Sequence, residues 1–177
     1  MRLQSNSVPL ISQGKLARST PIHSSNFYAA NGNDGSFTSA YASKQITSSN
    51  QIEYWWLDLE GLYVLDSILI FAFKRHIDYK LYFVNDFPVV ERNETVYGEA
   101  CDSFHGISSL ETAPSRVTES NQHLFMYNTS NCRGSGRFLI IQGKSPANSH
   151  MYFHEIEVYG SMIGNLCFCY LFKVRIV

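Results

Sequence analysis

The fold is decided largely by one stretch, YWWLDLEGLYVLDSILIFAF, which runs from Tyr54 to Phe73. Two of its segments, Trp55–Leu59 and Val64–Phe73, are rich in the aromatic and β-branched side chains that favour strands. Further segments of this kind are separated by loops rich in Gly, Asn, Asp, Ser and Pro. They are Tyr79–Val84, His123–Asn128, Arg137–Gln142 and His150–Tyr159. Because no helical periodicity lasts three turns outside these strands, the sequence predicts an all-β sandwich or jelly roll.

The composition indicates one globular domain. The 177 residues include 14 Lys and Arg against 15 Asp and Glu, which gives a net charge of −1. Such a chain has no overall field to attract nucleic acid or an acidic membrane. Aromatic residues make up 14% of the chain, which argues against disorder. We therefore expect one domain over residues 5–160, no nucleic-acid partner, and an apolar tail over residues 161–177. The apolar run of this tail, Leu166–Phe172, is too short for a transmembrane segment.

Motifs of common enzymes are absent from the sequence. It contains no GxSxG nucleophile elbow, no HExxH zinc motif and no catalytic Cys/His signature. His150 and His154 share a face of a predicted strand, but at four residues apart they are separated by about 13 Å. That distance is too long for one metal ion. The sequence therefore favours a binding module over an enzyme.

Two polar clusters are candidate binding sites. The loop Asn31–Ser36 is dense in the oxygen donors that Ca²⁺ prefers, although an ordinary Asx turn has the same composition. The basic cluster Lys74, Arg75 and His76 lies between two predicted strands. Its guanidinium fork and imidazole suit a polyhydroxyl ligand, and a solvated hairpin tip is the alternative.

Five segments match the motifs of one known family in order and spacing. The opening segment Val8–Thr20 resembles N-x-A-x-x-G-K-x-A-x-Q-S-S, and Ala30–Gly35 resembles N-A-x-D-G-N. Tyr54–Leu59 resembles P-W-W-x-V-D-L. Gly136–Ile140 resembles G-R-Y-V-x-I, and His154–Gly160 resembles C-E-V-E-V-Y-G. The family is that of the fucolectins (F-type lectins), related to the discoidin or coagulation factor type C domains. The resemblance implies a β-sandwich jelly roll of the galactose-binding-domain type.

The resemblance also implies a disulfide between Cys101 and Cys132. Closing this loop of about 30 residues would contribute roughly 3–4 kcal/mol in the chain-entropy model. The two cysteines of the tail would lie outside the core. Two N-glycosylation sequons begin at Asn93 and Asn128. Together these features predict a secreted or extracellular domain whose signal peptide is not present in this chain.

A calcium site is the third implication. The implied ligands are the carboxylates of Asp34 and Glu155, the backbone carbonyls of Asn31, Ser36 and His154, and Gln45 in place of a family serine. We expect the two carboxylates to converge in space and bound Ca²⁺ to raise the melting temperature.

The fucose site of the family is degenerate here. Fucolectins bind fucose through one His, two Arg and an adjacent Cys–Cys pair. The His position falls at Thr47 or Ser48, the first Arg position falls near Phe73, and the Cys–Cys pair is missing. Only Arg75 matches the second Arg. We therefore expect millimolar or undetectable fucose affinity, with Arg75 and its two neighbours forming a different polar pocket.

These observations predict an extracellular, calcium-stabilised, lectin-like module that binds glycans or glycoproteins. Two arrangements stay open, a homo-oligomer and a part of a larger multidomain protein. One alternative is a discoidin-type adhesion module that binds protein or phospholipid through apolar loop tips. A second alternative is a domain detached from a larger receptor or enzyme and kept for folding or targeting.

Overall fold

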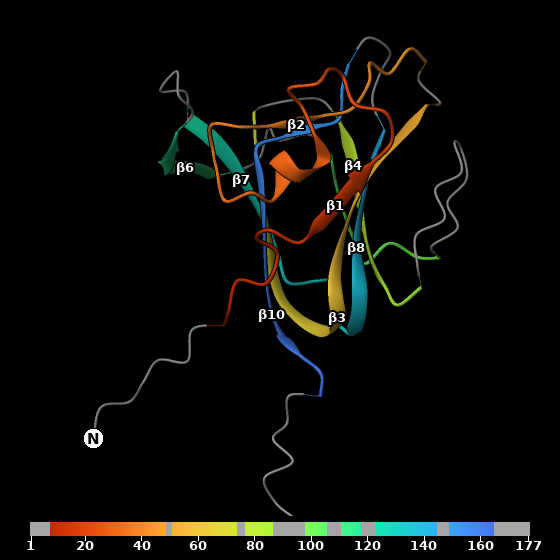
Figure 1. Ribbon diagram of the computed structural model, residues 1–177, viewed down its shortest axis with the longest axis vertical. Coiled ribbons are helices and arrows are strands. Elements are labelled where there is room, and N and C mark those ends of the chain that lie inside the picture. The colour runs from red at the N-terminus through yellow and green to blue at the C-terminus, as the bar shows by residue number, and fades with distance from the viewer. Residues whose placement is uncertain are drawn as a thin grey trace, which may run out of the picture.

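One strand, β3 (Ile52–Ala72), runs through the centre of the structure and pairs with four others (Figure 1). The computed structural model describes residues 8–48, 51–73, 77–86, 98–105, 111–117, 123–144 and 149–164. The sequence predicted two separate strands here, and this was wrong. The strand continues through Glu60, which adopts a positive φ of 63°, and the ladder with the next strand shifts register between Asp58 and Tyr63. The strand therefore bends at Glu60 without ending.

The other elements are short strands and one turn of 3-10 helix. They are β1 (Leu16–Ser19), η1 (Ala29–Gly32), β2 (Tyr41–Ala42), β4 (Asp78–Val84), β5 (Asp102–His105), β6 (Glu111–Val117), β7 (His123–Thr129), β8 (Ser135–Lys144), β9 (Tyr152–Phe153) and β10 (Glu155–Met162). Within the described ranges, no helix has the length and apolar character needed to span a membrane.

The bend in β3 produces two layers. Hydrogen bonding follows the order β5-β4-β8-β3-β7-β6, and β1 and β10 also pair with β3. The first half of β3 pairs with β1 and β8, whereas the second half pairs with β7 and β10. We call the layer β5-β4-β8-β3-β1 sheet I and the layer β10-β3-β7-β6 sheet II. All pairings are antiparallel, and the predicted all-β sandwich is confirmed.

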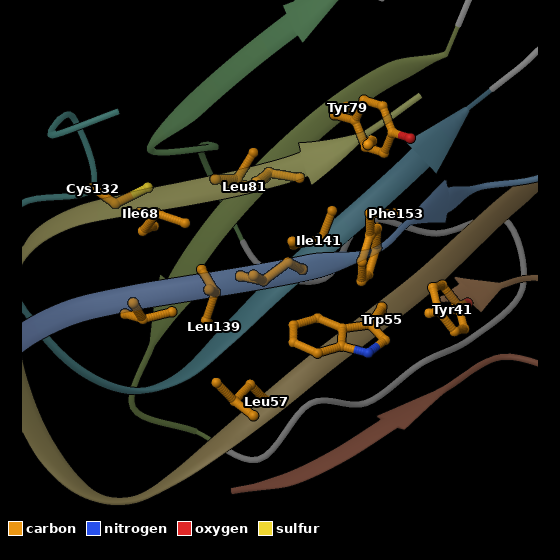
Figure 2. Close-up of a cluster of buried hydrophobic side chains, with 14 of the residues drawn as sticks. Tyr41, Trp55, Leu57, Ile68, Tyr79, Leu81, Cys132, Leu139, Ile141 and Phe153 are labelled. Atoms are coloured by element: carbon orange, nitrogen blue, oxygen red, sulfur yellow. The ribbon is translucent and has the colours of Figure 1, made fainter. Parts of the chain in front are cut away.

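The core lies between the two sheets. Trp55 and Leu57 come from sheet I and Ile68 from sheet II, and all three are buried in one apolar cluster (Figure 2). Trp55 also donates a hydrogen bond from Nε1 to the carbonyl of Ala29, at 2.8 Å, which ties the loop around η1 to the core. Gly32 of this loop allows the close approach, because a Cβ there would lie 2.5 Å from the Phe153 ring.

Two of the quoted sequence motifs meet in an ion pair. The guanidinium of Arg137 donates to both carboxylate oxygens of Asp58, each at 2.7 Å. These hydrogen bonds hold the pKa of Asp58 below its usual range. The ion pair joins β8 to the first half of β3.

The predicted disulfide between Cys101 and Cys132 is present, with the two Cα atoms 4.7 Å apart. It joins the start of β5 to the segment after β7. The segment between the two cysteines, which contains β5, β6 and β7, therefore begins and ends at the same place in the sandwich. Cys132 itself is buried in the core cluster.

The remaining differences from the predicted strands have local causes. Predicted strand His150–Tyr159 is divided at His154, because β9 pairs with β2 while β10 pairs with β3. Strands β1, β2, β5 and β6 were not predicted, since they are short or polar. Strand β6 contains Pro114, at the point where its ladder with β7 shifts register. Strand β10 ends at Met162, beyond the expected domain boundary at residue 160.

Candidate functional site

A cavity of about 480 Å³ opens on sheet I, where β3 begins and β8 ends. Four strands of the sheet contribute its lining. The lining residues are Ile52 of β3, Asp78, Tyr79 and Lys80 of β4, Ser103 and Phe104 of β5, and Gln142 and Lys144 of β8. The cavity therefore depends on the pairing of the strands rather than on one segment of sequence.

The register of sheet I explains why polar side chains gather here. Lys80 pairs with Gln142 on one side and with Ser103 on the other, and Asp78 pairs with Lys144. Directly opposed residues of antiparallel strands share a face, and successive residues alternate between faces. The intervening residues of β4 belong to the core. The five polar side chains therefore project together from the face of sheet I that points away from sheet II.

Gln142 is the best-anchored polar group of the cavity. It is only 5% exposed, and the Tyr82 hydroxyl donates a 2.8 Å hydrogen bond to its Oε1. The Tyr82 hydroxyl is protonated at neutral pH, as an ordinary tyrosine is, and burial raises its pKa further. Tyr82 packs with Tyr54 and Ile140 in a separate apolar cluster. This packing orients the Gln142 amide before any ligand arrives.

The predicted sugar-binding residues Lys74, Arg75 and His76 lie outside the described residues. Asp78, which follows them closely in the chain, lines the cavity. The ring of Phe73, near which the sequence comparison put the first Arg position, lies 4.7 Å from the ring of His154. The degenerate fucose site stays a prediction.

The structure brings together two of the predicted calcium ligands, Asp34 and Glu155. The Glu155 carboxylate accepts a hydrogen bond from the Gly35 amide at 3.1 Å. Burial, and then the nearby Asp34 carboxyl, raise the pKa of Glu155 to about 8. The Asp34 carboxylate accepts hydrogen bonds from the Ser36 amide at 2.8 Å and from the Ser39 hydroxyl at 2.6 Å. A cation here would relieve the repulsion between two ionised carboxylates.

The other predicted ligands are placed differently. Asn31 and Ser36 belong to the same loop as Asp34, and His154 precedes Glu155. Gln45, in contrast, lies well away, because Ile46 bridges to Ser149 while Tyr41 pairs with Phe153. Gln45 therefore lies next to the bridge at Ile46, several residues along the chain from the part that pairs near Glu155, and its assignment as a ligand stays a prediction.

Ser39 is the residue that sequence reasoning missed at this loop. Besides its hydroxyl contact with Asp34, its carbonyl lies 2.9 Å from Nδ1 of His154. The pairing of β2 with β9 was the missing information, since it brings the segment before Tyr41 alongside the segment that follows Phe153. Among the described residues, no three His, Cys, Asp or Glu side chains are grouped to hold a metal. A cation at this loop would therefore need backbone carbonyl oxygens as well as the two carboxylates.

Comparison with solved structures identifies the fold. The chain is similar to chitosan-binding module 1 of a chitosanase/glucanase from Paenibacillus sp. IK-5, at 14% identity over 86% of this chain and 99% of that one, with a TM-score of 0.58. It is similar to a fucolectin from striped bass (Morone saxatilis) serum, at 14% identity over 88% of this chain and 48% of that one, with a TM-score of 0.61. A third relative in fold is the fucose-binding module SpX-3 of Streptococcus pneumoniae, at 17% identity over 86% and 98% of the two chains, with a TM-score of 0.53.

No protein-family model and no curated protein sequence matches the chain. At these low identities, the likeness to solved structures establishes the fold. The chain has the same β-sandwich fold as these modules, as the sequence motifs predicted.

Proposed function

We propose that the protein is a lectin-like module that binds glycans in the cavity of sheet I. The observation that carries the proposal is the polar lining of that cavity. The Gln142 amide, the Ser103 hydroxyl and the Lys80 ammonium lie side by side on three paired strands. Such groups match the hydroxyls of a sugar, and the anchored amide reduces the entropy lost on binding.

Two further observations support a binding role, and a third supports a place outside the cell. Proteins of the same fold include modules described as fucose-binding and chitosan-binding. The described lining contains one carboxyl group, Asp78, whereas hydrolysis of a glycosidic bond generally uses a pair. The disulfide between Cys101 and Cys132 belongs to an oxidising compartment.

Two parts of the proposal extend beyond the cavity. We assign Ca²⁺ to the loop Asn31–Ser36, where the carboxylates of Asp34 and Glu155 meet. Arg75, with Lys74 and His76, is assigned to the same ligand as the cavity, because these residues closely precede Asp78 in the chain. Arg75 is the proposed anchor, since its fixed fork can bond two adjacent hydroxyls.

A glycan array probed with and without Ca²⁺ tests the proposed function. We expect the labelled chain to bind a defined group of glycans and to bind them more strongly with Ca²⁺. L-fucose alone should bind with millimolar affinity or undetectably, because two of the family's three charged donors are lacking. Signal no higher than that of a heat-denatured sample, in both conditions, would contradict the proposal.

A further inference from the structure

The charge of the cavity distinguishes among possible sugars. Both Lys80 and Lys144 line the cavity, and their side chains are exposed to it. Because Lys80 pairs with Gln142, Lys144 occupies the diagonal position on the neighbouring strand. Diagonal neighbours on one face lie about 7–8 Å apart, within reach of a shared partner for two long side chains. Two ammonium groups can therefore approach the same ligand group.

Few acidic groups oppose these two lysines. Asp78, directly opposite Lys144, is the one acidic residue of the described lining, so the lining carries one more positive charge than negative. Ion pairs in the described part of the chain join Lys15 to Glu60 and Arg137 to Asp58, and none involves Lys80 or Lys144.

Two further acids of these strands, Asp102 and Glu53, lie outside the cavity lining. The Asp102 carboxylate accepts a 2.7 Å hydrogen bond from the Tyr127 hydroxyl, away from the cavity lining. Glu53 is 2% exposed; one of its carboxylate oxygens accepts a hydrogen bond from Gln51, and the other is buried without a hydrogen-bond partner among the described residues. Neither of these carboxylates lines the cavity.

We infer that the cavity selects acidic glycans, whose sugars carry a carboxylate or a sulfate. The anionic group lies between Lys80 and Lys144, and the sugar hydroxyls bond to Gln142 and Ser103. A charge-assisted hydrogen bond is about twice as strong as a neutral one, so the anionic group dominates selection. Amino sugars, which carry ammonium groups, meet charges of their own sign and are disfavoured. This inference rests on the proposed function, because it names the ligand class of the same cavity.

Matched pairs of sugars test the inference by calorimetric titration. The pairs are methyl β-D-glucuronide against methyl β-D-glucoside, and galactose 6-sulfate against galactose. We expect each acidic member to bind about tenfold more tightly than its neutral partner. The preference should fall steeply when the salt concentration rises to about 1 M, where the screening length is about 3 Å. Chitotriose serves as the amino-sugar control and should bind more weakly than the acidic sugars.

Two variants assign the effect to the cavity. Lys80→Gln and Lys144→Gln should each reduce the acidic preference several-fold, and the double variant should abolish it. Lys44→Gln is the matched control, because Lys44 is exposed but does not line the cavity. It should leave the preference unchanged. Circular dichroism of each variant checks that the sheet is intact.

The outcomes separate this inference from the proposed function. Equal affinity for the two members of each pair would overturn acidic selection and leave glycan binding in place. An acidic preference that persists in the double lysine variant would overturn it as well, since the charge would then come from elsewhere. No binding of any of these sugars would overturn it too, and the glycan array would then decide whether glycan binding itself survives.

Discussion

Replacing both Cys101 and Cys132 by alanine should lower the free energy of unfolding by about 3–4 kcal/mol. The two residues are 31 positions apart in sequence, and their bond removes conformational freedom from the unfolded chain. The loop that it closes holds β5, β6 and β7. Urea denaturation followed by tryptophan fluorescence measures the loss, because buried Trp55 reports on the core.

The tail offers a matched control for this experiment. Cys167→Ala with Cys169→Ala removes two cysteines that we predict to lie outside the core, and we expect no change in stability. The Cys101/Cys132 double variant should also bind the glycan ligand less tightly, because β5 supplies Ser103 to the cavity. Unchanged stability in that variant would contradict the disulfide and the secretory assignment together. Mass mapping of the unsubstituted chain that finds the thiols of Cys101 and Cys132 free would contradict them as well.

Stability should also depend on pH through Glu155 when calcium is absent. Its pKa is about 8 in the folded protein against an ordinary value of 4.5, so the folded state holds the proton more tightly. The stabilising contribution is complete below pH 4.5 and is lost as the pH rises to 8. At about 1.4 kcal/mol per pKa unit, the loss across this window is on the order of 3–5 kcal/mol. Urea denaturation at several pH values gives the slope.

Calcium should reverse this loss, because it binds the deprotonated carboxylates. Adding 10 mM Ca²⁺, roughly ten times a weak extracellular dissociation constant, should raise the melting temperature more at pH 8 than at pH 5. Glu155→Gln should remove both the pH slope and most of the calcium effect. Glu99→Gln, which changes an exposed glutamate, is the matched control. A flat pH profile with no calcium shift would exclude this site.

Much of the fold could be predicted from the sequence because strands leave a local signature. The apolar runs around Trp55, Leu81 and Ile140 predicted β3, β4 and β8, since each supplies residues to a buried face. Continuity of β3 through Glu60 could not be predicted, because a charged residue followed by Gly61 also fits a turn. Short polar strands such as β5 are held by their neighbours rather than by their own composition.

The candidate sites were predictable to different degrees. The disulfide and the meeting of Asp34 with Glu155 followed from family motifs. The placement of Gln45 could not be predicted, because a motif position does not reveal the register of a two-residue strand. The cavity was missed, because Lys80 and Lys144 lie far apart in sequence and each alone resembles an ordinary exposed lysine. Only the pairing of β4 with β8 places them together.

The central claim is that glycans bind in the cavity of sheet I. Its most direct test is an NMR titration of the ¹⁵N-labelled chain with a glycan that the array identifies. The account predicts that the largest amide shifts fall on Lys80, Ser103, Gln142 and Lys144, the residues of three paired strands that line the cavity. Shifts confined to the exposed apolar residues Leu62 and Met162, with none at the cavity, would contradict it.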